Sequence, residues 1–359
     1  MQQIDLVIIG AGQSGLAAAY EARAAGVEAV VLEASQTAAG AWPRCYDSLT
    51  LFSPARYSSL PGWPFPGDPD RYPVRDEVVA YLSAYARQFG DGVRLGERVE
   101  TVALEGGGGF RVATSVGSDL VAGAVIAASG SFGMPYMPQL PGLDGFTGTV
   151  LHSAQYDAPH RFARQRVVVV GAGNSAVQIA AELAAVAATT LATREPVKWF
   201  EQRPLGRDIH WWLERTRLDT APLSRWLVRL PVSVIDTGIY RAVLAAGRPD
   251  RRPMFDRLDG EQVVWSDGSR ERLDGLILAT GYRPNLPYLA DTKALDADGL
   301  PLHRGGVSTT VSGLGYVGLE FQRSFSSNTL RGCGRDARHV VAALRAHATG
   351  PRRSAMSVR

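Results

Sequence analysis

One local pattern occurs twice in the sequence, once in each half of the chain. The apolar run Leu6–Ile9 leads into the glycine-containing segment Gly10–Gly15 and then into an alanine-rich stretch. The run Val167–Val170 leads in the same way into Gly171–Ala176 and a second alanine-rich stretch. Each pattern predicts a buried strand, a tight turn and a helix, which is the first part of a βαβ unit that binds a dinucleotide.

The residue types in the two turns have separate tasks. Glycines allow the sharp turn and the close approach of a pyrophosphate, and the helix that follows offers unpaired amides and its positive dipole end. The turn residues that we expect to hold the two cofactors are Gly10, Gly12, Ser14, Gly15, Gly171, Gly173, Asn174 and Ser175. Ala176 stands where a third glycine is usual. The alternative for either motif is an ordinary tight turn without a ligand.

The two units differ at one equivalent position. Glu33 and Arg194 each follow the second strand of their unit, 23 residues after the first glycine of the turn. A carboxylate there accepts hydrogen bonds from a ribose diol, whereas a guanidinium suits a 2′-phosphate. We therefore expect FAD at the first site and NADPH at the second. The alternative for Arg194 is an ordinary surface arginine.

The repeat also predicts the domain organisation. We expect an α/β fold with two dinucleotide-binding, Rossmann-like domains, the second inserted into the first. Residues 1–156 would begin the FAD-binding domain, residues 157–275 would form the NADPH-binding domain, and residues 276–359 would return to the FAD-binding domain and end in a helix at 335–348. A small helical cap at about 199–253 would cover the substrate pocket. A β-meander is expected over 93–128.

Composition excludes several classes of function. Lysine and arginine total 38 against 35 acidic residues, and the arginines are scattered, so nucleic acid is not an expected partner. Cys45 and Cys333 lie far apart, which argues against a disulfide-type reductase and favours a reducing cytoplasm. Histidines show no metal-ligand spacing, so no metal site is expected. No apolar stretch is long enough for a membrane span, and oligomeric state is not encoded in any pattern.

With these features in place, the sequence resembles the flavin-containing monooxygenases over nearly its whole length. Its most specific match is Phe146-x-Gly148-x-x-x-His152-x-x-x-Tyr156, which is similar to the family signature ahead of the NADPH-binding domain. Leu278–Tyr282 resembles the Ala-Thr-Gly motif at a strand end, and Ala128-Ser129-Gly130 resembles an earlier copy of it. Leu51–Pro54 is similar to the plant auxin-forming branch and to bacterial proteins linked to metal or arsenical resistance.

The resemblance implies further residues beside the flavin. Gly40-Ala41-Trp42 is similar to a Gly-x-Trp motif whose indole stacks beside the flavin, although core packing is the alternative for Trp42. Glu320 would hold the ribityl chain, or else be a solvated glutamate. The other residues that the resemblance assigns to FAD are Val99, Ser129 and Gly130. His152 is interpreted as a structural histidine that tethers a domain linker, with acid–base catalysis as the alternative.

The implied activity is insertion of one oxygen atom from molecular oxygen into a soft nucleophile, nitrogen or sulfur, through a flavin peroxide. Phe52 and Ser53 are candidates for the substrate pocket. Many family members place asparagine where Phe52 stands, which keeps open an NADPH oxidase or diaphorase that releases hydrogen peroxide. Asp157 follows Tyr156 where a Baeyer-Villiger signature has Trp-Pro, so a Baeyer-Villiger-type oxygenase is a less favoured alternative. A redox-sensing binding module is a further one.

Overall fold

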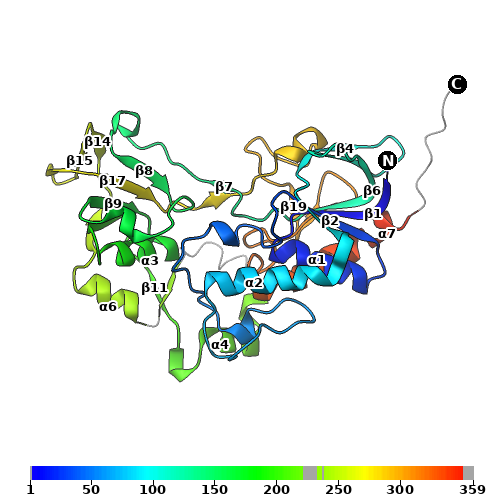
Figure 1. Cartoon of the computed structure of the whole chain (residues 1–359), viewed down its shortest axis with the longest axis horizontal. Helices are drawn as coiled ribbons and strands as arrows, with labels where there is room; N and C mark the ends of the chain where they lie inside the picture. The colour runs from blue at the N-terminus through cyan, green and yellow to red at the C-terminus, as the bar shows by residue number, and fades with distance from the viewer. Residues whose placement is uncertain (1, 221–232, 237, 351–359) are drawn as a thin grey trace.

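The computed structural model describes residues 2–220, 233–236 and 238–350. The chain forms two lobes, each built around parallel strands (Figure 1). Both the beginning and the end of the chain lie in one lobe, and the middle of the chain forms the other. This arrangement confirms the predicted α/β fold class, in which the second dinucleotide-binding unit is inserted into the first.

The larger sheet has nine strands, of which the central ones, β21, β6, β1 and β2, run parallel. Leu6 and Ile8 of β1 belong to one buried cluster, whereas Val7 and Ile9 belong to the cluster on the opposite face. An apolar strand of this kind is expected where both faces of a sheet are covered. The strands of this sheet are β1 (Gln2–Ile9), β2 (Ala29–Glu33), β3 (Val93–Leu95), β4 (Val99–Leu104), β5 (Phe110–Thr114), β6 (Leu120–Ala127), β19 (His303–Arg304), β20 (Val307–Ser308) and β21 (Leu314–Tyr316).

Helices cover one face of this sheet, and two strands with a 3-10 helix pack against the other. The helices are α1 (Gln13–Ala24), α2 (Arg75–Ala86) and α7 (Leu330–Ala348). The opposite face packs against β4, β5 and the 3-10 helix η8 (Pro287–Thr292). Because β4, β5 and β6 pair antiparallel in sequence order, with Gly106–Gly109 between β4 and β5, the predicted meander is confirmed over these three strands.

The smaller sheet has five strands, all parallel. Helix α3 (Asn174–Leu183) packs on one face, against Val167 and Val169, and Val168 and Val170 face the other. A three-stranded antiparallel sheet packs on that other face. Its strands are β14 (Arg257–Asp259), β15 (Gln262–Val264) and β16 (Arg270–Arg272). The five strands are β8 (Thr149–His152), β9 (Arg166–Val170), β10 (Ala188–Thr193), β13 (Asp250–Pro253) and β17 (Gly275–Leu278).

A pair of two-residue strands lies between the lobes. β7 (Met134–Pro135) and β18 (Tyr282–Arg283) pair antiparallel there (Figure 1). The boundaries expected at 156 and 275 differ from this topology, because β8 before the first boundary and β17 across the second both belong to the smaller sheet. The two strands pair with each other, so the passage between lobes is better placed at β7 and β18.

The cap contains more than helices. It includes α4 (Ile209–Thr216) and α6 (Ile239–Ala245), as expected, but β11 (Trp199–Glu201) and β12 (Val234–Asp236) form a short parallel pair. The last residues of the expected cap, β13, extend the smaller sheet beside β10. Residues 221–232 of the cap, and the tail after residue 350, lie outside the described residues.

Helix ends also differ from expectation. Helix α7 begins at Leu330 rather than near residue 335, because Thr329 caps it by accepting a hydrogen bond from the Gly332 amide. Helix α3 ends at Leu183, although the alanine-rich stretch continues to Ala187. Alanine favours helix but carries no stop signal, so the sequence alone does not mark that end. None of the described helices is long and apolar enough to cross a membrane.

Gly123 in β6 gives a test of packing between the larger sheet and α7. A Cβ on this residue would lie 2.6 Å from the His347 carbonyl oxygen and 2.7 Å from that of Ala348. We expect Gly123→Ala to lower the free energy of unfolding by about 1–3 kcal/mol, because α7 must move off the strand. Denaturant unfolding measures this change.

The matched control is Gly106→Ala, since a Cβ there meets no atom within 4 Å and its backbone is not left-handed. We expect the control to alter the free energy of unfolding by less than about 0.5 kcal/mol. Equal stability of the two variants would contradict the close approach of α7 to β6.

Candidate functional site

The predicted cofactor residues of the first lobe gather at one edge of its sheet. β1, β2, β6 and β21 are parallel, so their carboxyl ends lie together. β1 ends at Ile9, just before Gly10, and β2 ends at Glu33. Ser129 follows shortly after β6, and Gly318 shortly after β21. Ligands of open α/β sheets bind outside the carboxyl ends of the strands. The topology therefore brings four separate predicted segments to one place.

The first glycine turn depends on the absence of side chains at two positions. Gly10 has φ +105°, and a Cβ on it would lie 2.9 Å from the Ala128 carbonyl oxygen. A Cβ on Gly15 would lie 1.8 Å from the Gly10 carbonyl oxygen, which no rearrangement of side chains can relieve. These glycines let β1, the turn and α1 pack closely.

Glu33 is buried and holds the glycine turn against β2. Its carboxylate accepts hydrogen bonds from the Ala11 amide at 2.7 Å and from the amide and hydroxyl of Ser35, both at 2.9 Å. The sequence predicted the place of this carboxylate at the end of β2. It did not predict the contact with Ala11, since the two residues are joined only through the fold.

The segment after β6 is tied to the segment after β21. The Ser131 hydroxyl donates to the Gly318 carbonyl oxygen at 2.9 Å and accepts from the Glu320 amide at 2.8 Å. The side chains of Ser129 and Glu320 are exposed, and the Ser129 hydroxyl lies 2.9 Å from that of Tyr288. Because Ser129 follows β6 and Glu320 follows β21, both side chains lie at the predicted edge. Ser131 and Tyr288, which the sequence interpretation missed, position this edge.

Trp42 and Val99 have different surroundings. The Trp42 indole donates to Gln13 Oε1 at 2.6 Å, and Gln13 Nε2 donates to the Asn328 carbonyl oxygen at 3.0 Å. This chain of contacts joins the Gly-x-Trp motif to the first turn of α1 and to the residues before α7. Val99 is buried where β4 begins, so only its main chain can face a ligand.

The second glycine turn repeats the geometry of the first. Gly171 has φ +143°, and a Cβ on it would lie 2.4 Å from the Ala279 carbonyl oxygen. Ala176, which stands in place of a third glycine, is buried. Its Cβ has room because residue 171 is a glycine: a Cβ on Gly171 would lie only 3.0 Å from it. Asn174 Oδ1 accepts from the Ile235 amide at 3.2 Å, which attaches the turn to the cap. Ser175 is half-buried in the first turn of α3.

Arg194 follows β10 and is exposed. In the part of the chain that the structure describes, no carboxylate forms an ion pair with its guanidinium. This differs from Glu33, whose carboxylate is buried and accepts three hydrogen bonds within the protein. A free guanidinium at the carboxyl end of β10 retains its capacity to bind an anion from solution.

Each edge has open space beside one of its predicted glycines. A Cβ on Gly130 or on Gly173 meets no protein atom within 4 Å, so the space beside each is open. Helices α1 and α3 have no capping side chain and no acidic residue in their first turns. Their amides and positive dipole ends therefore suit a pyrophosphate.

His152 ends β8 and is buried. Its Nε2 lies 3.0 Å from the Gly281 carbonyl oxygen, and its Nδ1 accepts from the Ala154 amide at 3.1 Å. Since both ring nitrogens are used within the protein, the geometry favours the structural interpretation of this residue. Burial lowers the pKa of the imidazole, and the contact with Gly281 opposes that shift in part.

Phe52 and Ser53 lie against the cap. The Phe52 carbonyl oxygen accepts from Gln202 Nε2 at 2.9 Å, and its ring is 6.0 Å from the His210 imidazole at an interplanar angle of 23°. Ser53 turns away, to within 2.8 Å of the Ser58 hydroxyl. The structure thus places Phe52, rather than Ser53, at the contact with α4.

Asp208 and His210 form a polar cluster that the sequence interpretation missed. Asp208 caps α4, and its Oδ1 accepts from the His210 amide at 2.9 Å and lies 2.7 Å from His210 Nδ1. Its Oδ2 accepts from the Tyr72 hydroxyl at 2.6 Å and from Gln202 Nε2 at 2.8 Å. Burial alone would raise the pKa of the Asp208 carboxyl, but these hydrogen bonds together hold it below its ordinary value.

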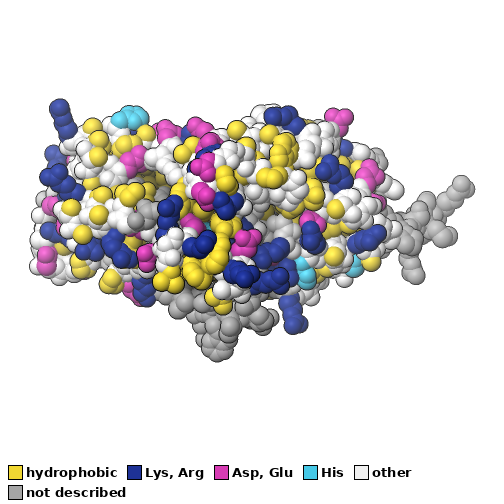
Figure 2. Space-filling view, turned by 90° about the horizontal axis from the view of Figure 1, so that it is seen from below, with side chains coloured by type: hydrophobic (Ala, Val, Ile, Leu, Met, Phe, Trp, Pro, Cys, Tyr) yellow, Lys and Arg dark blue, Asp and Glu magenta, His cyan; other side chains and the backbone are white. Residues whose placement is uncertain are grey.

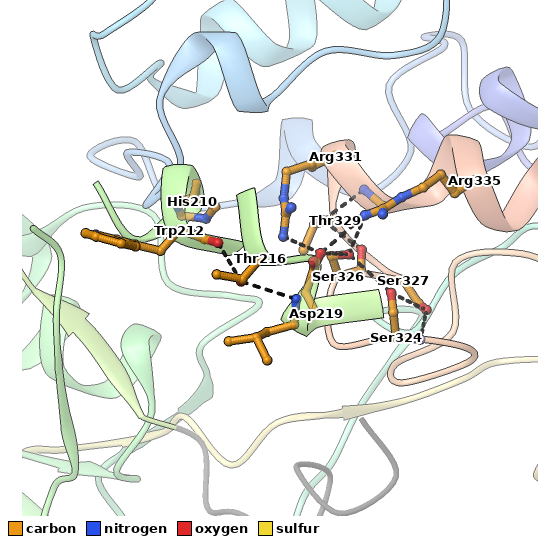
Figure 3. A network of polar contacts seen from close by, with 12 residues as sticks. His210, Trp212, Thr216, Asp219, Ser324, Ser326, Ser327, Thr329, Arg331 and Arg335 are labelled. Atoms are coloured by element: carbon orange, nitrogen blue, oxygen red, sulfur yellow. Dashed lines mark hydrogen bonds and ion pairs between the residues drawn. The ribbon is translucent and has the colours of Figure 1, made fainter. Parts of the chain in front are cut away.

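A second missed cluster joins the cap to α7. Figure 3 shows Asp219, from the 3-10 helix η7 (Leu218–Thr220), between Arg331 and Arg335. Asp219 Oδ2 lies 2.7 Å from Arg331, 3.2 Å from Arg335 and 3.0 Å from the Ser326 hydroxyl that donates to it. The Asp219 side chain is only 1% exposed, so this contact closes the cap over the start of α7.

Charged side chains are distributed as the sequence predicts. On the face seen in Figure 2, basic side chains are interspersed with acidic and apolar ones. Within the described residues no group of histidine, cysteine and acidic side chains has a metal-binding arrangement. Cys45 is half-buried, Cys333 is buried, and both are free, so neither supplies half of a redox disulfide.

Comparisons with known proteins agree with this architecture. The family model described as pyridine nucleotide-disulphide oxidoreductase matches residues 7–216. The chain is 31% identical to a CzcO-like uncharacterized oxidoreductase of Geobacillus kaustophilus, over 94% of this chain and 97% of that protein. It is 32% identical to the indole-3-pyruvate monooxygenase YUCCA1 of rice, over 98% of this chain and 94% of that protein.

A solved structure extends the similarity to three dimensions. The flavin-containing monooxygenase of Stenotrophomonas maltophilia superposes with a TM-score of 0.86 at 34% sequence identity, over 97% of this chain and 99% of the other. The monooxygenase names of this structure and of the rice relative agree with the family that the motifs at 40–42, 146–156 and 278–282 resemble. The chain therefore belongs to the flavin monooxygenase family and is a flavin-dependent oxidoreductase of that family.

Proposed function

We propose that this protein is an FAD-dependent, NADPH-consuming monooxygenase that inserts one oxygen atom into a soft nucleophile, nitrogen or sulfur. The observation that carries the choice of cofactors is the contrast between Glu33 and Arg194 at equivalent strand ends. Glu33 is buried beside the first glycine turn, and Arg194 is exposed and unpaired among the described residues beside the second.

FAD would occupy the edge of the larger sheet. The glycine turn and the amides of α1 would hold the pyrophosphate, Glu33 would bind the ribose, and Trp42 would lie beside the flavin. The full set that we propose for FAD is Gly10, Gly12, Ser14, Gly15, Glu33, Trp42, Val99, Ser129, Gly130 and Glu320. The open space beside Gly130 supports this assignment.

NADPH would occupy the edge of the smaller sheet. The turn and α3 would bind the pyrophosphate through Gly171, Gly173, Asn174 and Ser175, and Arg194 would bind the 2′-phosphate. Open space beside Gly173 and the uncapped start of α3 support this assignment. Residues 1–156 and 276–359 would then serve FAD, and residues 157–275 would serve NADPH, with the passage between lobes at β7 and β18.

The cofactors supply the chemistry, and the protein supplies placement. Bound flavin would accept a hydride from the nicotinamide and activate molecular oxygen for transfer to the substrate. The chain's own residues would orient the substrate and keep water away from it. The aromatic contacts of Phe52 with the cap and the buried ion pair of Asp219 with α7 support this role.

One specific feature keeps the peroxide-releasing oxidase as a second candidate. Phe52 offers a ring and a carbonyl oxygen, but no side-chain amide, toward the cap. The rice relative carries the name indole-3-pyruvate monooxygenase, which supports oxygenation over simple oxidase activity.

We also keep the reducing cytoplasm as the proposed location, in agreement with two free cysteines.

The balance between oxygenation and peroxide release can be measured directly. We expect that NADPH oxidation in the presence of a thioether or a tertiary amine yields mostly oxygenated product and a minority of hydrogen peroxide. Both products are quantified in one reaction mixture against NADPH consumed. Release of one peroxide per NADPH with every probe would replace the monooxygenase proposal with the oxidase.

Arg194 tests the choice of nicotinamide coenzyme. A charge-assisted contact is worth about 1.5–3 kcal/mol, so we expect Arg194→Ala to raise the KM for NADPH roughly 10- to 100-fold. The KM for NADH should change less than about twofold. Steady-state kinetics with both coenzymes measure the difference. The control is Arg257→Ala, an exposed arginine of the same lobe. Equal losses for both coenzymes would exclude a contact between Arg194 and the 2′-phosphate.

Asp219 tests the closure of the cap. In Asp219→Asn the Arg331 guanidinium loses its buried counter-charge, so we expect a loss of about 3 kcal/mol in the free energy of unfolding. We also expect a larger share of NADPH to appear as hydrogen peroxide, because water reaches the pocket more easily. The control is Asp291→Asn, since Asp291 is exposed. Unchanged peroxide release with lowered stability would restrict Asp219 to a structural role.

A further inference from the structure

The Asp208–His210 cluster is poised for proton transfer at a defined atom. An ionised carboxylate only accepts hydrogen bonds, so the 2.7 Å contact with Asp208 Oδ1 requires that His210 Nδ1 carries a hydrogen. In the uncharged form of the ring with this hydrogen, the lone pair is at Nε2. Asp208 is itself fixed by donors at both oxygens, including Tyr72 and Gln202. This arrangement sets both the tautomer and the orientation of the ring.

Nothing in the described part of the chain uses that lone pair. No hydrogen bond joins His210 Nε2 to any described residue, although the side chain is only 6% exposed. The rings of Phe52 and Tyr57 each lie 6.0 Å from the imidazole, at 23° and 24° to its plane. A single polar acceptor thus lies among aromatic rings, where the cap meets the loop that carries Phe52.

Charged side chains surround the two tyrosines that contact this cluster, Tyr57 and Tyr72. The groups that act on Tyr57 are Asp208, Glu214, Arg56 and Asp70, and those that act on Tyr72 are Asp208 and Arg203. Arg56 and Asp70 pair with each other at 2.8 Å. Arg203 contacts Tyr72. The Asp208 and Glu214 carboxylates have the Arg203 and Arg331 guanidinium groups nearby, so the uncommitted group of the cluster is the imidazole itself.

We propose that His210, oriented by Asp208, is the residue that binds a protonated amine substrate and removes its proton before oxygen transfer. The N–H bond of the ammonium breaks, its electron pair remains on the substrate nitrogen, and the proton moves to His210 Nε2. Asp208 stabilises the imidazolium, which later returns the proton to solvent. This inference rests on the proposed function and names the substrate class as a tertiary or secondary amine with an apolar body.

The step answers a chemical requirement of nitrogen oxygenation. An aliphatic ammonium with a pKa near 10.4 is free base in only about one molecule in 2,500 at pH 7. Oxygen transfer needs the nitrogen lone pair, so a proton acceptor at the site raises the reactive fraction. A thioether carries no such proton and needs no acceptor.

The test compares a matched pair of substrates, N,N-dimethylbenzylamine and benzyl methyl sulfide. In His210→Gln the side chain still accepts a hydrogen bond but takes no proton. We expect kcat/KM for the amine at pH 7 to fall at least tenfold and to recover as the pH approaches 10. The value for the sulfide should stay within about twofold. Asp208→Asn, which retains a good helix cap, should show the same selective loss.

A second readout does not depend on turnover. The sequence has six histidines, so His210 can be assigned in ¹⁵N-histidine spectra by its absence in His210→Gln. We expect its Nε2 resonance to move to the protonated position when the amine is added, and not when the sulfide is added. Equal kinetic losses for both substrates, unchanged kinetics with the amine, or an unmoved Nε2 resonance would each overturn the role of His210.

The proposed function fails separately from this inference. If the wild-type protein oxygenates neither substrate but the Nε2 resonance still shifts with the amine, the proton acceptor stands and the monooxygenase proposal falls. If the sulfide is oxygenated and the amine neither reacts nor moves the resonance, the monooxygenase stands and the proton acceptor falls.

Discussion

Both nucleotide-binding edges depend on close contact between a glycine turn and the end of a neighbouring strand. Gly10 lies against Ala128, and Gly171 lies against Ala279, so closely that a Cβ would reach within 2.9 Å and 2.4 Å of the respective carbonyl oxygens. Ala128 and Ala279 begin the Ala-Ser-Gly and Ala-Thr-Gly segments. The glycine turns and these segments are therefore two sides of one packing contact, repeated in each lobe. Substitution on either side would move the strand end away from the ligand.

The two edges have similar backbone geometry, but the charged residue at the end of the second strand differs between them. At the first, the carboxylate of Glu33 is buried and bound to the Ala11 amide, so it is oriented before any ligand arrives. At the second, Arg194 is exposed, and a bound phosphate would have to order a long side chain. This difference supports the proposal that the first edge holds a resident cofactor and the second an exchanging coenzyme. That difference agrees with a flavin that remains bound while nicotinamide coenzymes enter and leave.

Local sequence was sufficient for the fold class, the duplicated units and the strand ends, because each of these depends on residues a few positions apart. It placed Glu33 and Arg194 correctly at the ends of β2 and β10. The domain boundaries remain a prediction, and the pairing of β8 with β17 could not be read from local sequence. It missed Asp208 and Asp219 because their partners, Tyr72 and Ser326, are 136 and 107 residues away. No spacing rule joins residues so far apart, and the site residues themselves remain predictions.

The cap is fixed to the first lobe at two places, each through an acidic side chain of the cap. At one place Asp208 accepts a hydrogen bond from Tyr72, which precedes α2 in the first lobe. At the other place Asp219 pairs with Arg331 at the start of α7. Both acidic groups come from the cap, and both of their partners come from the first lobe. The cap therefore cannot rotate away without exposing two carboxylates and a guanidinium together. On our proposal, substrate selection belongs to the interface between the lobes, where α4 presents His210 to Phe52, rather than to either dinucleotide-binding fold alone.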